Sequence, residues 1–174
     1  FMDLKSKLRH VKDFPKTGID FIDITPVLQD PEALCKCLEQ MKEKALTFGD
    51  FDLIVCPESR GFIFGSPLAY MLKKGFVPIR KKGKLPYKTV SIEYQLEYGT
   101  DILEMHEDAI LPGQKVIIVD DLLATGGTPF SNIELVEKLG GKVAGIVYFI
   151  ELTYLNGREK LKDYKVETIV KIDS

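Results

Sequence analysis

The sequence predicts an α/β domain built around a mostly parallel β-sheet. Short apolar runs alternate with helix-like segments along most of the chain, and this alternation is typical of parallel strands joined by crossover helices. Several of the runs are almost continuously apolar, as expected for strands that are buried on both faces. Ligands bind to such sheets at the carboxyl ends of the strands, so the loops that follow the apolar runs are the first candidates for a site.

The first long element is an amphipathic helix in DPEALCKCLEQMKEKALTFG, residues 30–49. Asp30 has the side chain of an N-cap, Pro31 suits the first helical position, and Gly49 can end the helix. Its apolar stripe predicts packing rather than function, and the stripe consists of Leu34, Leu38, Met41, Ala45 and Phe48.

The alternation then continues to residue 150. The expected strands are 51–56, 76–79, 115–120 and 143–150, and the expected helices are 64–74, ended by Gly75, and 129–140. Because the carboxyl ends of parallel strands meet at one edge, the loops CPESRGF and VDDLLATGGT should face one cleft.

The pattern changes between residues 80 and 110. RKKGKLPYK is basic and contains glycine and proline, which predicts a loop. TVSIEYQLEY alternates apolar and polar residues like a half-exposed antiparallel strand, and GTDILEMHEDAI is expected to pair back with it. We expect a mobile ribbon over the cleft.

Composition narrows the class of protein. The chain has 174 residues, of which 45% are hydrophobic and 29% charged, as in a globular domain. Its formal net charge of −2 argues against a general nucleic-acid binder. The basic segment RKKGK has no companion stripe of arginines, so it is interpreted as a local feature.

The cysteines and the lengths of the apolar runs indicate the cellular compartment of the protein. The three cysteines, Cys35, Cys37 and Cys56, show no repeating CxxC, which argues against disulfides and structural zinc. The segment FMDLKSKLRHVKDF lacks the apolar core of a signal peptide, and no apolar run is long enough to span a bilayer. The sequence predicts a cytoplasmic protein without a membrane partner.

Two adjacent carboxylates follow the apolar run KVIIV. The expected strand brings Asp120 and Asp121 to its end. Burial of neighbouring carboxylates is costly unless something neutralises or hydrogen-bonds them. Ribose hydroxyls are suitable donors, and a nearby divalent cation would help further.

A loop of small residues follows the aspartates: Ala124, Thr125, Gly126, Gly127 and Thr128. Glycines let backbone N–H groups approach one anion, and the next helix directs its positive end to the same point. A sugar phosphate would satisfy both the carboxylates and the loop. Neither GxGxxG nor GK[ST] is present, so the loop is neither a Rossmann nor a Walker motif. The alternative is an ordinary glycine-containing turn.

The stretch VIIVDDLLATGGT resembles the phosphoribosyl-pyrophosphate signature of the type I phosphoribosyltransferases. Further segments resemble the members of this family that act on adenine, in the same order along nearly the whole chain: DFPKTGIDFIDITPVL, ESRGFIFGSPLAY, GFVPIRKKGKLP, YQLEYGTDILEMHEDAI and IELTYLNGREKL. The resemblance implies the type I phosphoribosyltransferase fold in a single domain over residues 1–174. That fold has a small hood of about residues 1–30 and a flexible antiparallel loop.

The resemblance also implies a reaction. The phosphoribosyl group would pass from phosphoribosyl pyrophosphate to adenine, giving AMP and pyrophosphate in purine salvage, with Mg²⁺ and in a homodimer. No dedicated protein ligand is expected for the metal, which substrate phosphates and water would hold. Apolar residues around Phe62, Phe64 and Tyr70 give weak support for the dimer.

Residue roles follow from the same resemblance. Asp120 and Asp121 would hold the ribose hydroxyls, and residues 124–128 the 5′-phosphate. Glu97 would exchange a proton with the adenine ring while Tyr98 excludes water. Contacts to pyrophosphate would come from Ser59, Arg60, Arg80, Lys81 and Lys84, and contacts to adenine from Asp20, Phe21, Ile22 and Leu152.

Each role has a plainer alternative. Arg60 could form only a surface salt bridge, the basic loop could be solvated, Glu97 and Tyr98 could lie on an exposed strand, and Phe21 could be a core residue. The sequence departs from the family at Asp20 and Ile22, where an apolar and a basic residue are usual. Pro129 removes one potential phosphate donor.

Two other functions stay open at this stage. One is a phosphoribosyltransferase for another purine, such as xanthine or hypoxanthine. The other is a regulator that binds phosphoribosyl pyrophosphate without chemistry. The GIDFID and LEYGTD segments argue against the first, and the presence of Glu97 argues against the second.

Overall fold

The computed structural model describes residues 2–95 and 99–174. The chain separates into two compact units, residues 1–40 and 41–174. The first unit extends beyond residue 30, where the hood was expected to end, and the assignment of the whole chain to one domain stays a prediction.

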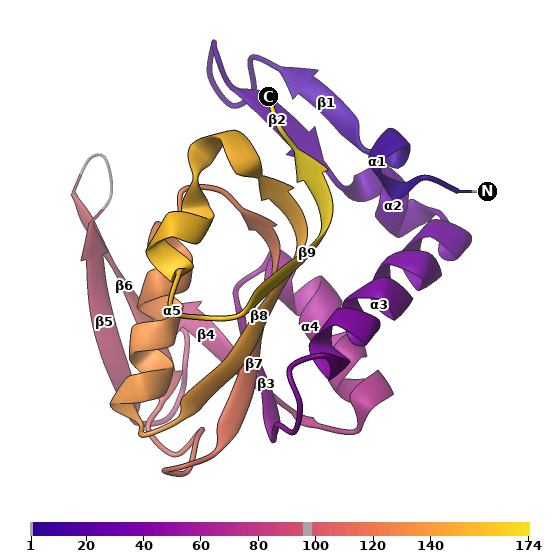
Figure 1. Cartoon of the computed structure of the whole chain (residues 1–174). Coiled ribbons are helices and arrows are strands. Elements are labelled where there is room, and N and C mark those ends of the chain that lie inside the picture. Colours follow the sequence, from indigo (N-terminus) through magenta and orange to yellow (C-terminus); the bar gives the residue numbers. More distant parts are fainter. Residues whose placement is uncertain (1, 96–98) are drawn as a thin grey trace. The chain divides into compact units, whose positions relative to one another are not determined.

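The second unit is built on a seven-stranded sheet in the order β5-β6-β4-β3-β7-β8-β9, counted over the described residues (Figure 1). The strands are β3 (Leu53–Pro57), β4 (Gly75–Lys81), β5 (Thr89–Gln95), β6 (Thr100–His106), β7 (Lys115–Leu123), β8 (Lys142–Leu152) and β9 (Val166–Ile172). Neighbours from β4 to β9 run parallel, whereas β6 is antiparallel to both β4 and β5. The predicted mostly parallel sheet and antiparallel ribbon are confirmed.

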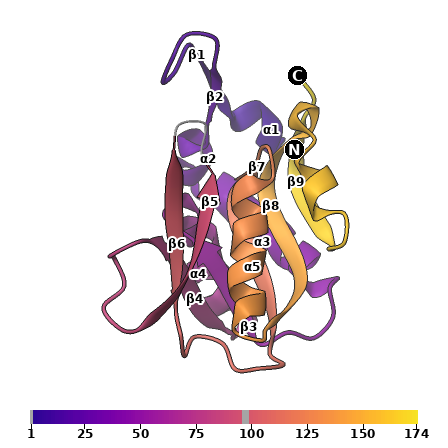
Figure 2. The ribbon, with the colours of Figure 1, turned by 90° about the vertical axis from the view of Figure 1, so that its left-hand side faces the viewer.

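Helices α4 (Arg60–Leu72) and α5 (Gly127–Lys138) cover opposite faces of this sheet (Figures 1 and 2). The α5 face buries a cluster that includes Val55, Ile118, Ile133 and Tyr148. On the α4 face Phe64 packs against the strands, and its ring lies 5.5 Å from that of Phe149. Both faces of the central strands are therefore apolar, which explains their continuous apolar runs.

Helix α4 lies directly on β3 because Gly65 has no side chain. A Cβ at this position would lie 1.8 Å from the Sγ atom of Cys56. Phe64 belongs to the same contact face and is fully buried. Its expected place on an exposed dimer surface is therefore wrong, because the side chain points into the core.

The first unit contains α1 (Leu4–Lys7), the antiparallel pair β1 (Arg9–Lys12) and β2 (Asp20–Asp23), α2 (Thr25–Gln29) and the start of α3 (Pro31–Leu46). Asp30 accepts hydrogen bonds from the N–H groups of Glu32 and Ala33 at 3.0 and 3.3 Å. The predicted N-cap and helix are confirmed. The β1–β2 hairpin was not predicted, because most residues of β1 are polar.

Several element boundaries differ from the expectation, among them those of α4 and β7. Helix α4 begins at Arg60 rather than near residue 64, so the last three residues of the ESRGF segment belong to its first turn. It ends where Lys73 adopts a left-handed conformation with φ of 57°, and Gly75, the predicted end, instead starts β4. Strand β7 runs on to Leu123, since its pairing with β8 continues past Asp120.

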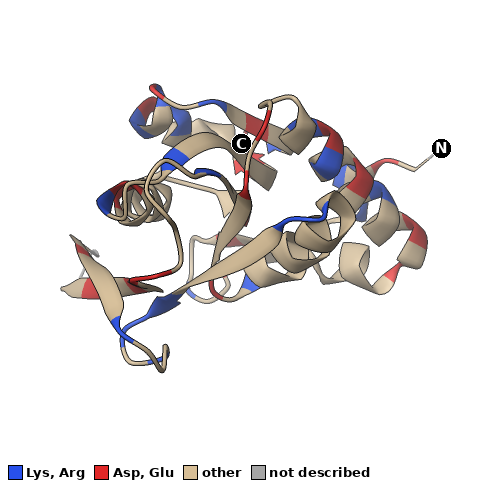
Figure 3. Cartoon of the chain, turned by 90° about the horizontal axis from the view of Figure 1, so that it is seen from below, with Lys and Arg blue, Asp and Glu red and all other residues tan. Residues whose placement is uncertain are grey.

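Two short 3₁₀ helices, η1 (Thr153–Leu155) and η2 (Gly157–Leu161), connect β8 to β9. Acidic and basic residues are mixed over the helices and strands (Figure 3). Within the described residues, no helix combines the length and apolar character that crossing a membrane requires. All cysteines are free thiols, and Cys35 is exposed while Cys37 and Cys56 are buried.

Candidate active site

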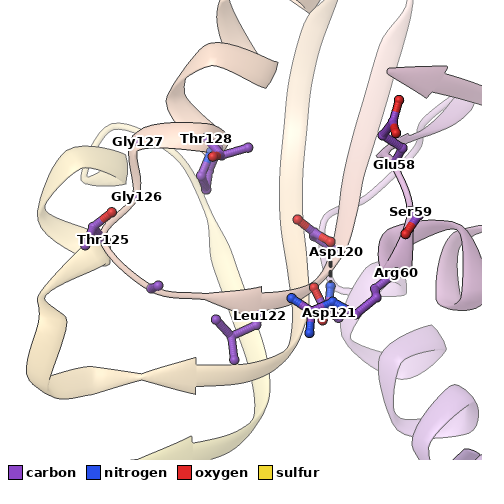
Figure 4. A pocket seen from close by; sticks show the side chains of 12 residues that line it. Glu58, Ser59, Arg60, Asp120, Asp121, Leu122, Thr125, Gly126, Gly127 and Thr128 are labelled. Carbon is purple, nitrogen blue, oxygen red and sulfur yellow. Dashed lines mark hydrogen bonds and ion pairs between the residues drawn. The ribbon is translucent and has the colours of Figure 1, made fainter. Parts of the chain in front are cut away.

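One pocket joins the two loops that the sequence predicted to face a common cleft. Residues 58–60, at the junction of β3 and α4, form one side (Figure 4). Residues 120–122 and 124–129, from β7 to the start of α5, form the other. The prediction that these loops share a cleft is confirmed, because β3 and β7 are adjacent parallel strands.

The paired aspartates lie near the carboxyl end of β7. The N–H of Asp121 donates to Oδ1 of Asp120 at 2.8 Å, and Nε of Arg60 lies 3.0 Å from Oδ2 of Asp121 (Figure 4). The Asp121 side chain is 6% exposed. Its Oδ2 has no hydrogen bond of good geometry among the described residues, so the contact with Arg60 is an ion pair rather than an aligned hydrogen bond.

Burial and charge act together on Asp120. Burial, followed by the negative charge of Asp121, raises the pKa of Asp120 well above its usual value. Tyr148 lies opposite Asp120 in the pairing of β7 with β8, and its hydroxyl finds no hydrogen-bond partner in the described part of the chain. Burial and the two aspartates also raise the pKa of Tyr148. Hydrogen-bond donors or a positive charge from a ligand would therefore stabilise the groups at the end of β7.

The glycine-rich loop connects β7 to α5. Gly126 has φ of 89° and is the N-cap of the helix, a conformation that suits glycine. Thr125 and Thr128 are exposed, so their hydroxyls are available to a ligand. The first N–H groups of a helix have no partner within it. Pro129 has none to offer, so Gly127 and Thr128 supply the donors at this helix end.

The segment from Asn156 to Leu161 packs against the glycine-rich loop. A Cβ at Gly126 would lie 2.7 Å from the carbonyl oxygen of Gly157, so the two backbones are in direct contact. Arg158 fixes the segment: its Nε is 2.9 Å from both carboxylate oxygens of Glu151, and Nη1 donates to the carbonyl of Val166 at 2.9 Å. Sequence reasoning assigned no role here, and its only signal was the Asn-Gly-Arg turn.

The predicted pyrophosphate contacts divide into two groups. Ser59 and Arg60 line the pocket. The second group lies on β4 and the loop after it, outside the pocket lining, and consists of Arg80, Lys81 and Lys84. Arg80 and Lys84 form ion pairs with Glu58, which does line the pocket. The Nζ atom of Lys81 is 3.8 Å from Oδ2 of Asp101. Glu58 itself was not predicted.

The predicted adenine contacts fall in different units. In the first unit, Asp20 is exposed and pairs with Nδ1 of His10 at 3.0 Å, Phe21 stacks edge-on against Phe14, and Ile22 is buried. In the second unit, Leu152 is buried at the end of β8. The adenine assignment therefore stays a prediction, and the catalytic candidates Glu97 and Tyr98 lie outside the described residues.

Within the ranges 2–95 and 99–174, no group of three or more His, Cys, Asp or Glu side chains could hold a metal ion. Asp120 and Asp121 line the same pocket as the glycine-rich loop and place carboxylate oxygens, which are hard donors, in its lining (Figure 4).

Paired carboxylates beside a glycine-rich helix start, at the carboxyl edge of a parallel sheet, are an arrangement that suits a phosphorylated sugar. Comparison with known families agrees with this class. Residues 24–174 match the phosphoribosyl transferase domain, and the chain therefore belongs to the phosphoribosyltransferase family.

Individual relatives narrow the comparison to adenine phosphoribosyltransferases. The chain is 75% identical to the adenine phosphoribosyltransferase of Acetivibrio thermocellus, with 97% of this chain and 99% of the relative covered. The crystal structure of the enzyme from Thermoanaerobacter pseudethanolicus matches with a TM-score of 0.93 and 56% identity, covering 97% and 98% of the two chains.

A liganded structure is similar as well. The adenine phosphoribosyltransferase of Saccharomyces cerevisiae, complexed with an imino-altritol bisphosphate and adenine, matches with a TM-score of 0.87 and 41% identity, covering 95% and 96% of the two chains. The resemblance found in the sequence and the predicted fold class are both confirmed.

Proposed function

We propose that this chain transfers the phosphoribosyl group of phosphoribosyl pyrophosphate to adenine, forming AMP and pyrophosphate in purine salvage. The observation that carries the proposal is the pocket in which Asp120 and Asp121 lie beside the glycine-rich loop. The named relatives support the choice of adenine over xanthine or hypoxanthine and of catalysis over regulation.

The sugar phosphate would bind by its two ends. Ribose hydroxyls would donate to Asp120 and Asp121, which offsets the cost of holding two carboxylates side by side. The N–H groups and hydroxyls of residues 124–128 would surround the 5′-phosphate at the start of α5. This geometry would fix the anomeric carbon relative to the leaving group.

The charge of the pocket supports a role for Mg²⁺. The lining contains the carboxylates of Glu58, Asp120 and Asp121 but only the guanidinium of Arg60, while the substrate is a polyanion. The oxygen-rich lining, in which Oδ2 of Asp121 accepts no hydrogen bond of good geometry, fits a hard cation. Bound mainly by substrate phosphates and water, Mg²⁺ would offset the charge that develops on the departing pyrophosphate.

The remaining roles belong to residues near the base and the leaving group. Glu97 would accept a proton from adenine, and Tyr98 would exclude water from the oxocarbenium-like transition state. Asp20, Phe21, Ile22 and Leu152 would form the adenine pocket. Ser59, Arg60, Arg80, Lys81 and Lys84 would contact pyrophosphate.

Initial rates with four bases test the proposal. Phosphoribosyl pyrophosphate and Mg²⁺ are supplied with adenine, hypoxanthine, guanine or xanthine, and pyrophosphate release is measured. We expect release with adenine and little with the oxopurines, because an oxopurine leaves the acceptors for the exocyclic amine unpaired. Equal rates with an oxopurine would contradict the choice of base, and binding without release would favour the regulator.

A substitution tests the proton-transfer role. Glu97→Gln should lower kcat by about 100-fold or more while sugar-phosphate affinity is retained. Glu93→Gln, a matched change at an exposed position on β5, is the control and should have little effect. An unchanged kcat in the first variant would remove Glu97 from this role.

We also infer a homodimer in the cytoplasm. On α4 the side chain of Tyr70 is 87% exposed and that of Ile63 is 40% exposed, which suits a covered apolar face. Three free thiols suit a reducing compartment. Sedimentation as a monomer at micromolar concentration would contradict the dimer.

A further inference from the structure

Glu58 is a partly buried carboxylate at the junction of β3 and α4. Its side chain is 11% exposed, and both of its oxygens have partners. Oε1 accepts from the backbone N–H of Lys81 at 2.8 Å and from Nε of Arg80 at 3.2 Å. Oε2 accepts from Nζ of Lys84 at 3.0 Å. One carboxylate therefore gathers three donors from β4 and its following loop.

These contacts keep Glu58 ionised. Burial acts to raise the pKa of Glu58, but the hydrogen bonds from Lys81 and Lys84 and the charges of Lys84 and Arg80 outweigh it and lower the pKa below its usual value. The guanidinium of Arg80 also lies over the ring of Phe62, 5.8 Å from its centroid. Arg80 is thus held from two sides.

The cations remain reachable from solvent. The side chains of Arg80 and Lys84 are 32% and 49% exposed, and Glu58 lines the pocket beside Ser59 and Arg60. An anion that enters the pocket next to Glu58 therefore meets cations that are already paired with a carboxylate.

We propose that Glu58 is a positioning residue that acts as a built-in counter-ion for Arg80 and Lys84. It holds both cations beside the pocket when pyrophosphate is absent, and it competes with pyrophosphate for them, which weakens product binding and promotes release. This inference rests on the proposed function, because it takes Arg80 and Lys84 to be pyrophosphate contacts.

The variant Glu58→Gln tests the inference. Glutamine keeps the size of the side chain and an acceptor oxygen but removes the charge, so the two cations become available to pyrophosphate. We expect pyrophosphate with Mg²⁺ to bind about tenfold more tightly in calorimetric titrations, with a lower KM for phosphoribosyl pyrophosphate and a lower kcat as release slows. Unchanged or weaker binding by the folded variant would overturn the inference.

Glu104→Gln is the matched control. Glu104 lies opposite Arg80 in the pairing of β4 with β6, and it accepts hydrogen bonds from the N–H of Gly83 and the hydroxyl of Thr89. The control removes the same charge from the same sheet edge without touching the Glu58 contacts. We expect pyrophosphate affinity within about twofold of the wild type, so an equal gain in both variants would contradict a specific role for Glu58.

A second variant covers the case in which the two cations left without a counter-ion prevent Glu58→Gln from folding. Combining Glu58→Gln with Lys84→Gln removes one charge of each sign, and pyrophosphate affinity should return to within about threefold of the wild type. A tenfold weakening would overturn the counter-ion role. The calorimetric titration of pyrophosphate needs no turnover, whereas the rates with the four bases test the proposed function. The inference about Glu58 and the proposed function can therefore fail separately.

Discussion

Gly157 lies against the carbonyl oxygen of Ala124, the first residue of the glycine-rich loop. A Cβ at position 157 would lie 2.4 Å from that oxygen and 2.9 Å from Cδ1 of Leu123. Real Cβ atoms do not approach backbone oxygen so closely. The shape of the loop therefore depends on a residue 33 positions further along the chain, which has no side chain.

Gly157→Ala should displace the glycine-rich loop, which we propose binds the 5′-phosphate. We expect KM for phosphoribosyl pyrophosphate to rise about tenfold or more, because misplaced donors lose their alignment with the phosphate. Gly145→Ala is the control, since its Cβ would lie 2.2 Å from the ring of Phe48 in the core. Both variants should be less stable than the wild type. An equal rise in KM in the control and in Gly157→Ala would contradict a specific role of Gly157 in shaping the loop.

Arg158→Met should destabilise the second unit. The change leaves the carboxylate of Glu151, which is 6% exposed, without the Nε of Arg158 that donates to both of its oxygens. Because the Arg158 side chain is 41% exposed, we expect a loss of about 2 kcal/mol in the free energy of unfolding, less than for a fully buried pair. Urea denaturation measures the loss. Glu151→Gln in the same chain should recover part of it, and no recovery would show that the charge is not the cause.

Asp120→Asn should stabilise the fold in a pH-dependent way. The pKa of Asp120 is raised by burial and by Asp121, so the folded state disfavours its ionisation. The wild type therefore loses stability as pH rises from the usual aspartate pKa of about 3.9 toward the raised value. Asparagine has no such loss. Urea denaturation should give the variant a higher free energy of unfolding than the wild type at pH 7 and nearly the same value at pH 4. An equal difference at both pH values would contradict the raised pKa of Asp120.

The cysteines should differ in reactivity. Cys35 is exposed, whereas burial raises the pKa of Cys37 to about 12 and that of Cys56 well above its usual value. At pH 8 a thiol reagent should label Cys35 rapidly and the other two only after unfolding. Cys35→Ser should remove the rapid phase. Rapid labelling of a second thiol in the native protein would contradict this order.

The sequence predicted the elements whose signals are local. The apolar runs, the cap at Asp30 and the loop of residues 124–128 can each be recognised within a short window. The start of α4 was predicted too late, although its N-cap residue Ser59 is of a type common at helix starts; in the structure this serine makes no side-chain cap hydrogen bond. The hairpin β1–β2 was missed because a largely polar strand shows little alternation.

The sequence predicted the part of the site that lies in one continuous stretch of the chain. Asp120, Asp121 and the glycine-rich loop are consecutive, so their pattern suffices. Glu58 meets Arg80 and Lys84 from 22 and 26 residues away, and only the parallel pairing of β3 with β4 brings them together. Glu151, Arg158 and Thr168 form a similar network across β8, η2 and β9. Such contacts depend on the fold and leave no local pattern.

A crystal structure with phosphoribosyl pyrophosphate and Mg²⁺ tests the central claim most directly. We expect the 5′-phosphate at the N–H groups and hydroxyls of residues 124–128, and the ribose hydroxyls within hydrogen-bond distance of Asp120 and Asp121. A ligand bound elsewhere, with the carboxylates and the loop both without contact to it, would contradict the account.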